Sequence, residues 1–200
     1  EAIRGNLPLL YGFSGLEPFG DRLAGNLSGG MKQKLGLSCC LVHEPRLILL
    51  DEPTNGVDPV SRREFWRILY DIAGGGVAVI VTTAYLDEAE RCGRIGLMYR
   101  GSFLMTGTPD EVKKSVERTM MEIRTDDPMR AETLLRGNDR FRRVIRTGSS
   151  LRFFSDSAES DGKEAADILG KAGVRAESIA PRQPDLEDVF IEIIGREGER

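Results

Sequence analysis

The sequence predicts an α/β protein in which a parallel-sheet core with a helical region is followed by a small α/β unit. Two short apolar runs, at 47–50 and 77–82, have the composition of parallel strands that are buried on both faces. Helical segments alternate with these runs, and further strand and helix candidates fill the C-terminal part. Two domains are expected, 1–116 and 117–200.

Composition limits the class of protein. The chain has 200 residues, of which 40% are hydrophobic and 30% charged, a balance typical of soluble globular domains. A formal net charge of −4 gives no indication of a nucleic-acid binder. No apolar run approaches the roughly 20 residues of a membrane span. Three cysteines, without metal-binding spacing, predict reduced thiols in a cytosolic protein.

The stretch 26–59 contains the candidate functional residues, and its first part is a glycine turn that opens a helix. Ser28 can cap a helix predicted over 31–42, and Gly29 and Gly30 carry no side chain where a ligand could approach the backbone. The N-terminal amides of such a helix suit a phosphate. An ordinary capped helix is the alternative interpretation of this segment alone.

Two acids directly follow the first apolar run. Asp51 and Glu52 would lie at the carboxyl end of a parallel strand, where open α/β sheets bind their ligands. An aspartate there can hold Mg²⁺, and an adjacent glutamate can orient or deprotonate an attacking water. The acids could instead cap a turn, but Pro53 after them and the glycine turn before them favour a functional site.

Together these segments resemble the ATP-binding cassette (ABC) ATPases. Leu27-Ser28-Gly29-Gly30-Met31-Lys32-Gln33 is similar to the signature motif of that family. The segment 47–52 resembles its Walker B strand with the catalytic glutamate, and Gly56-Val57-Asp58 resembles its D-loop. The resemblance extends over 16–115 and implies the C-terminal part of a P-loop ABC ATPase domain.

The resemblance also implies cofactors and roles for individual residues. ATP and Mg²⁺ are the expected cofactors, with Asp51 at the metal and Glu52 as the catalytic residue. In the family, the signature serves the ATP that a partner cassette holds. The residues expected in that role are Leu27, Ser28, Gly29, Gly30 and Gln33, and the D-loop residues are Gly56, Val57 and Asp58.

Two departures from the family pattern affect the expected activity. The sequence contains no Gly-x-x-x-x-Gly-Lys-Ser/Thr, so it has no phosphate-cradling P-loop. The family places its P-loop and Q-loop upstream, so the chain is expected to be a fragment that is inactive alone. Ala84 occupies the position of the switch-loop histidine, which reaches the γ-phosphate in the family. Because alanine has no donor, hydrolysis at this cassette's own site is expected to be weakened.

Local signals predict the remaining elements of the first domain. Asp58 is the expected cap of a helix over 59–73, and Arg100-Gly101 the expected turn of a hairpin. Thr108 and Glu111 form an expected capping box. Shorter helices are predicted over 7–13 and 86–91. The apolar face of the helix that Asp58 caps is expected to contain Phe65, Ile68, Leu69 and Ile72, with Trp66 at its margin.

The C-terminal part has the element order β-α-β-β-α-β, which predicts a ferredoxin-like fold. A final helix over 186–194, capped by Asp185, resembles the C-terminal element of ATPase subunits from ABC-2-type exporters. The strand candidates are 120–124, 141–146, 151–154 and 174–179, and the helix candidates are 128–136 and 162–172.

The resemblance implies an ATP-hydrolysing subunit of a bacterial ABC-2-type exporter, which couples hydrolysis to the efflux of an unidentified substrate. The expected partners are a second ABC cassette and a transmembrane permease of the ABC-2 type, with no nucleic acid. The expected location is the cytoplasmic face of the inner membrane. The segment 85–92, after a non-histidine residue, is similar to the first half of tandem two-cassette subunits.

Two alternatives remain. One is a cassette that binds and dimerises without hydrolysis, which Ala84 favours and Glu52 opposes. The other is a soluble repair-type ABC ATPase, which would need long flanking heptad runs or zinc-spaced cysteines; neither is present in this sequence.

Overall fold

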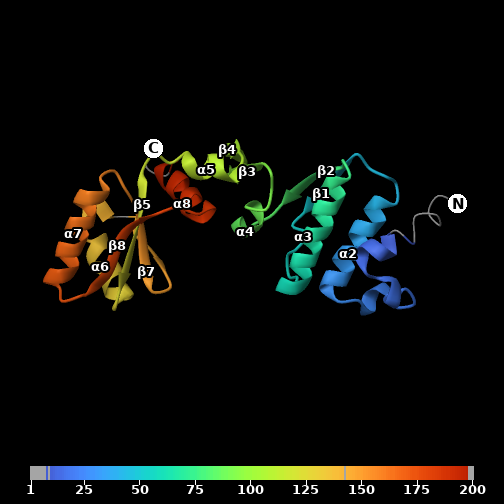
Figure 1. Ribbon diagram of the computed structural model, residues 1–200, viewed down its shortest axis with the longest axis horizontal. Coiled ribbons are helices and arrows are strands. Elements are labelled where there is room, and N and C mark those ends of the chain that lie inside the picture. Colours follow the sequence, from blue (N-terminus) through green and yellow to red (C-terminus); the bar gives the residue numbers. More distant parts are fainter. Residues whose placement is uncertain (1–7, 9, 142, 198–200) are drawn as a thin grey trace. The chain divides into compact units, whose positions relative to one another are not determined.

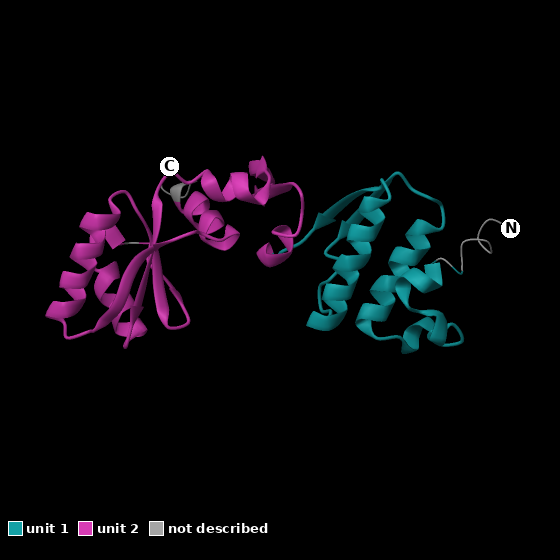
Figure 2. Cartoon of the chain, viewed as in Figure 1, with its two compact units in different colours: residues 1–85 teal, residues 86–200 magenta. Residues whose placement is uncertain are grey.

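The computed structural model describes residues 8, 10–141 and 143–197, and the chain divides after Tyr85 into two compact units (Figure 2). The short helix predicted over 7–13 includes residues 7 and 9, which lie outside the described residues. No helix in the described part has the length and apolar character needed to cross a membrane.

Helices α2 (Gly29–Leu41) and α3 (Pro59–Gly74) dominate the first unit (Figure 1). Ser28 caps α2, because its hydroxyl oxygen accepts a 3.3 Å hydrogen bond from the N–H of Met31. Asp58 caps α3 by accepting from two N–H groups of its first turn, at 3.0 and 3.1 Å. Both predicted caps are therefore confirmed, and α2 begins at Gly29 rather than Met31.

The predicted apolar face of α3 is buried in the core of this unit, together with residues of other segments such as Leu37 and Ile48. Two 3-10 turns, Glu17–Phe19 and Ala24–Asn26, precede α2. Helix α3 ends at the first of three consecutive glycines, 74–76, and the last of them, Gly76, has a φ of 91°. The buried residues of α3 are Phe65, Trp66, Ile68, Leu69 and Ile72.

A parallel pair of strands, β1 (Leu47–Asp51) and β2 (Ala78–Thr82), follows the predicted positions. The prediction that these strands are buried on both faces is wrong for the described residues. Ile48 is 4% exposed, whereas Leu49 is 68% and Ile80 55% exposed. The physical reason is that the described elements pack against one face of the pair and leave the face of Leu49 and Ile80 uncovered.

The second unit opens with α4 (Leu86–Ala89), which is a single turn and shorter than predicted. The hairpin of β3 (Ile95–Tyr99) and β4 (Ser102–Gly107) turns at Arg100 and Gly101, whose φ values of 49° and 80° confirm the predicted tight turn.

Helix α5 (Pro109–Lys114) follows the hairpin and starts with the predicted capping box. The N–H of Glu111 donates to the Thr108 hydroxyl at 3.2 Å, and the N–H of Thr108 donates to the Glu111 carboxylate at 2.8 Å.

A four-stranded antiparallel sheet in the order β6-β7-β5-β8 confirms the predicted ferredoxin-like fold (Figure 1). Its core is formed by residues of the sheet and of α6 and α7, among them Ile123, Leu135, Leu151 and Leu169, each 0% exposed. The elements are β5 (Thr119–Thr125), α6 (Pro128–Arg136), β6 (Ile145–Thr147), β7 (Ser150–Ser155), α7 (Ala158–Lys171) and β8 (Ala176–Arg182).

The strand predicted over 141–146 is shorter than expected. Residues Asp139–Phe141 form a 3-10 turn, and β6 starts only at Ile145. Phe141 is 1% exposed and packs edge-on against Phe153, with ring centroids 5.0 Å apart. Burial of this aromatic ring between helix and sheet therefore takes Phe141 out of the strand.

Helix α8 (Leu186–Glu197) joins the two parts of the second unit. Asp185 caps it as predicted, accepting from the N–H of Asp188 at 2.9 Å. Leu186 and Val189 pack into the core of the hairpin and α5, whereas the Glu192 carboxylate pairs with Arg118 at 3.0 Å. Because α8 returns to residues before 117, the compact unit begins at Leu86. The domain boundary between 116 and 117 stays a prediction.

Candidate functional site

The predicted acids lie where the sequence places them, at the carboxyl end of β1. In the parallel pair, Asp51 lies opposite Thr82 of β2. The Thr82 hydroxyl donates a hydrogen bond to the Asp51 carboxylate and accepts one from the N–H of Glu52 at 3.0 Å. The same N–H lies 3.1 Å from the Thr82 carbonyl oxygen. One threonine on the neighbouring strand therefore holds both acids.

Glu52 adopts a backbone conformation that residues other than glycine rarely take. Its φ is 43°, in the left-handed region, and its carboxylate accepts a 3.1 Å hydrogen bond from the side-chain amide of Asn55. Strained backbone of this kind persists where the surrounding structure fixes it, and it is frequent at functional sites. The turn thus ends β1 abruptly and leaves the Glu52 side chain exposed to solvent.

The donor chemistry at the end of β1 fits Mg²⁺. Carboxylate and hydroxyl oxygens are the hard ligands that this ion prefers, and it is commonly bound by one or two carboxylates with several waters. Among the described residues no group of three or more His, Cys, Asp and Glu side chains could hold a metal. Asp51 supplies one carboxylate of this kind, next to the Thr82 hydroxyl.

The signature residues form the exposed start of α2. Ser28 and Gly29 are exposed, and α2 has 13 residues, so its positive N-terminal end faces solvent where an anion could bind. A Cβ added to Gly29 would have a single neighbour within 4 Å, the carbonyl oxygen of Gly56 at 3.9 Å. The fold therefore brings the signature next to the D-loop of the same chain.

Other signature residues are packed rather than exposed. Leu27 is 9% exposed, Gly30 is buried, and Gln33 is half-buried. A Cβ at Gly30 would lie 2.5 Å from the Cβ of Ser61, which belongs to α3. The signature segment thus has a solvent-facing part and a part in contact with the next helix.

The D-loop leads directly into α3. Gly56 has a φ of 71°, which favours glycine, and the N–H of Val57 donates to the Thr54 carbonyl at 3.1 Å. The N–H and hydroxyl of Ser61 lower the pKa of Asp58 from its ordinary value, and the N–H of Val60 adds to this effect. Asp58 is therefore a charged helix cap at neutral pH.

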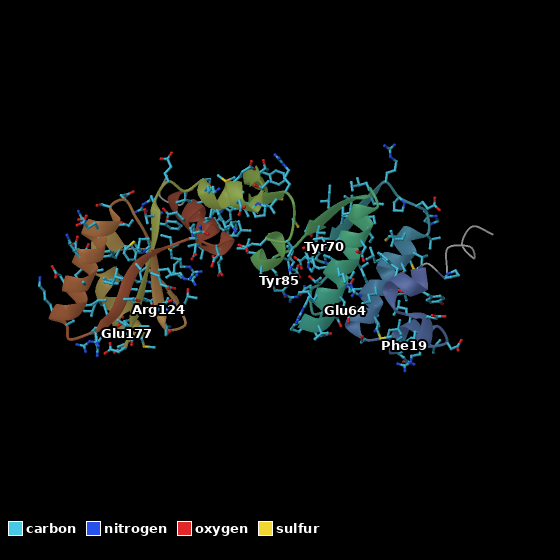
Figure 3. The ribbon with its side chains drawn as sticks, viewed as in Figure 1. Phe19, Glu64, Tyr70, Tyr85, Arg124 and Glu177 are labelled. Atoms are coloured by element: carbon cyan, nitrogen blue, oxygen red, sulfur yellow. The ribbon has the colours of Figure 1, made fainter. Side chains whose placement is uncertain are left out.

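Ala84 lies exposed just after β2. Beside it, the hydroxyl of Thr83 accepts a 3.0 Å hydrogen bond from the N–H of Tyr85. The Arg62 guanidinium lies 4.4 Å from the centroid of the Tyr85 ring, and Figure 3 marks Tyr85. The methyl group of Ala84 provides no hydrogen-bond donor at this position.

Sequence reasoning did not single out Thr82 or Asn55. Thr82 is the last residue of a predicted strand, but its place beside Asp51 depends on the register in which β1 and β2 pair. Asn55 lies in the turn after the acids, and its contact with Glu52 depends on that turn's backbone conformation.

Comparison with known families places the chain in a class. Residues 11–55 match the ABC transporter family, and residues 107–194 match the C-terminal domain of DrrA1-3-like ATP-binding proteins. These two matches identify part of an ABC transporter ATP-binding domain, followed by a second matched domain. The C-terminal part of the chain is, more specifically, similar to a DrrA1-3-like C-terminal domain.

Three curated relatives illustrate the similarity. The chain is 38% identical to a probable multidrug ABC transporter ATP-binding protein, YbhF, of Escherichia coli (strain K12), over 99% of this chain and 34% of that protein. It is 34% identical to a Nod factor export ATP-binding protein I of Rhizobium sp. (strain N33), over 99% of this chain and 63% of that protein. It is 34% identical to the daunorubicin resistance ATP-binding protein DrrA2 of Streptomyces coeruleorubidus, over 90% of this chain and 58% of that protein. The chain thus spans between a third and two thirds of the length of these relatives.

Solved structures support the fold. The cbiO1 protein of Clostridium perfringens, part of the ABC transporter complex cbiONQ, matches with a TM-score of 0.52 and 29% identity, over 57% of this chain and 46% of that one. A nucleotide-free ATP-binding cassette from an ABC transporter matches with a TM-score of 0.54 and 23% identity, over 58% of this chain and 47% of that one. At this identity the match supports the fold and nothing further.

Proposed function

We propose that this chain belongs to an ATP-hydrolysing subunit of an ABC-2-type exporter, which couples ATP hydrolysis to the efflux of a substrate. The observation that carries the proposal is the exposed acid pair Asp51–Glu52, fixed by Thr82 at the end of β1. The relatives named for Nod factor export and daunorubicin resistance support an export role.

Each acid has its own role in the proposed reaction. Asp51 holds Mg²⁺, which when bound neutralises phosphate charge, and Glu52 orients or deprotonates the water that attacks the γ-phosphate. The hydrogen bond from Asn55 and the strained backbone fix the direction of the Glu52 side chain. Preorganised groups of this kind act without reorganising during the reaction.

The signature acts on the nucleotide of a second cassette, on the same chain or in a dimer. The exposed Ser28 and Gly29 would contact its phosphates, together with the first amides of α2. Leu27, Gly30 and Gln33 complete the segment, and Gly56, Val57 and Asp58 lie beside it. The remaining partner is an ABC-2-type permease, so the subunit is located on the cytoplasmic face of the inner membrane.

Ala84 favours a cassette whose own site hydrolyses slowly. A methyl group cannot donate a hydrogen bond to a γ-phosphate, whereas the signature that serves the partner site is complete. This observation also favours a second candidate function, a cassette that binds nucleotide and dimerises without hydrolysing it.

The test is Mg·ATP hydrolysis by the complete protein with its permease in lipid vesicles. Gly29→Asp places a carboxylate where phosphate would approach, and we expect it to abolish most turnover. Gly36→Asp is the matched control, because Gly36 is exposed on the same helix with nothing within 4 Å of an added Cβ. A wild-type protein without Mg·ATP hydrolysis, or equal activity of the two variants, would refute the proposal.

A further inference from the structure

The first turns of α2 and α3 touch at Gly30 and Ser61. A Cβ at Gly30 would lie 2.5 Å from the Ser61 Cβ and 2.7 Å from its Oγ, which is closer than such atoms can approach. Gly30 is buried, so its missing side chain leaves the space that Ser61 occupies. The other glycines of α2 differ, because a Cβ at Gly29 would meet one oxygen at 3.9 Å and one at Gly36 would meet nothing within 4 Å.

The contact continues along both helices. On the next turn, Lys34 of α2 forms a 2.5 Å ion pair with Glu64 of α3, which is labelled in Figure 3. Residues three or four apart share one face of a helix, so this pair lies one turn further along the same helix faces than Gly30 and Ser61. The Lys34 side chain is only 16% exposed, and Leu37 and Phe65 are buried. The two helices thus pack closely from their first turns.

Ser61 connects this contact to the D-loop. Its N–H donates to the Asp58 carboxylate at 3.0 Å, while its side chain lies against Gly30. The Val57 Cγ1 atom would also lie 3.5 Å from a Cβ at Gly30. A single residue therefore takes part both in the cap that ends the D-loop and in the close approach of the signature helix.

We infer that Gly30 and Ser61 form a positioning pair that holds the signature in a fixed place relative to the D-loop. The inference rests on the proposed function, in which the exposed Ser28 and Gly29 serve the nucleotide of the partner cassette. Gly30 lacks a side chain because α3 needs the space, whereas Gly29 lacks one to leave phosphate access. A displacement of about 1 Å in such a site can reduce turnover ~10²-fold.

A compensation experiment tests the pair. Gly30→Ala, Ser61→Gly and the double variant are made in the complete protein. Gly30→Ala should lower the melting temperature by about 3–10 °C, because it overpacks the contact. Ser61→Gly removes both clashing atoms and leaves Val57 at 3.5 Å, an ordinary contact. The double variant should therefore melt close to Ser61→Gly alone, and should recover folding if Gly30→Ala does not fold.

ATP turnover separates positioning from general destabilisation. At a temperature where all variants are folded, Gly30→Ala should lower kcat about tenfold or more with a smaller change in KM. The double variant should return kcat to within about threefold of Ser61→Gly. Gly36→Ala is the control on the same helix, and it should leave kcat unchanged and the melting temperature equal or higher.

Three outcomes would overturn the inference. Wild-type melting and kcat for Gly30→Ala would show that the contact imposes no constraint. Failure of Ser61→Gly to restore stability would show that another contact requires the glycine. Restored stability without restored kcat would show that Gly30 acts on nucleotide and not on position. If the wild-type protein hydrolyses no ATP, the proposed function fails. The melting temperatures of the wild type, the two single variants and the double variant still decide whether the contact exists.

Discussion

Thr82 donates its hydroxyl hydrogen bond to the carboxylate of Asp51, across the two parallel strands of the first unit. The same oxygen accepts from the N–H of Glu52 at 3.0 Å, so one hydroxyl orients the proposed metal ligand and fixes the proposed catalytic residue. Outer residues that orient ligands in this way commonly affect metal affinity.

Replacement of Thr82 by valine should weaken Mg²⁺-dependent nucleotide binding at this cassette's own site by about tenfold. Valine keeps the β-branched shape of the strand residue but removes the hydroxyl, so Asp51 loses its orienting partner. The measurement is the Mg²⁺ dependence of nucleotide binding to the complete protein. Thr82→Ser is the control and should bind like the wild type; equal binding by the serine and valine variants would contradict the role of the hydroxyl.

The asymmetry of the two sites predicts unequal effects of two substitutions. Gly29→Asp obstructs the signature that serves the partner's nucleotide and should remove most steady-state turnover and transport. Glu52→Gln changes a site that Ala84 already weakens, so it should leave a substantial fraction of both. The measurement is the rate of ATP turnover and of transport by each variant in the complete transporter, with thermal melting to check folding. Equal severity of the two variants would mean that this cassette's own site turns over or is coupled to the other.

Ala84→His should raise ATP turnover by the complete protein. The position is exposed, so an imidazole fits without overpacking, and Glu52 already supplies a carboxylate. A positioned proton-transfer group is typically worth ~10²–10⁴-fold, and that range applies where the rest of the site is competent. Single-turnover hydrolysis with bound nucleotide is the measurement. Ala84→Phe adds a ring without a donor, and a rise of the same size in that variant would exclude the hydrogen-bonding explanation.

Glu192→Gln should lower the free energy of unfolding by about 1–3 kcal/mol. The Glu192 carboxylate is 2% exposed and pairs with Arg118 at 3.0 Å and Arg143 at 3.4 Å, so the substitution removes the buried negative charge that both guanidinium groups share, while Arg118 keeps its exposed partner Asp156 at 2.9 Å. Urea unfolding of the complete protein, followed by circular dichroism, is the measurement.

The control for this substitution is Glu159→Gln on α7. Its partner Lys163 lies 2.7 Å away, but the two side chains are 84% and 75% exposed. Water and salt screen an exposed pair, so the control should change stability by less than about 0.5 kcal/mol. Equal effects at both positions would show that α8 is not held by the buried carboxylate.

The caps of the helices could be predicted because they depend on neighbours in sequence. Ser28, Asp58 and Asp185 each bond to an N–H within three residues, and the capping box of Thr108 and Glu111 has the same short range. The β-α-β-β-α-β order likewise follows from local patterns. The local sequence around Phe141 favours a strand, whereas the burial of its ring against Phe153 depends on a residue twelve positions away.

The α/β class, the helix caps, the ferredoxin-like order, and the positions of the acids and the signature follow from local sequence patterns. The long-range partners of three residues depend instead on how the chain packs: Thr82 beside Asp51, Ser61 beside Gly30, and Arg118 beside Glu192. Two of these pairs are hydrogen-bonded across 31 and 74 positions of the chain. Contacts over such separations arise when strands pair and helices pack, so their geometry depends on burial throughout the unit and not on any local pattern.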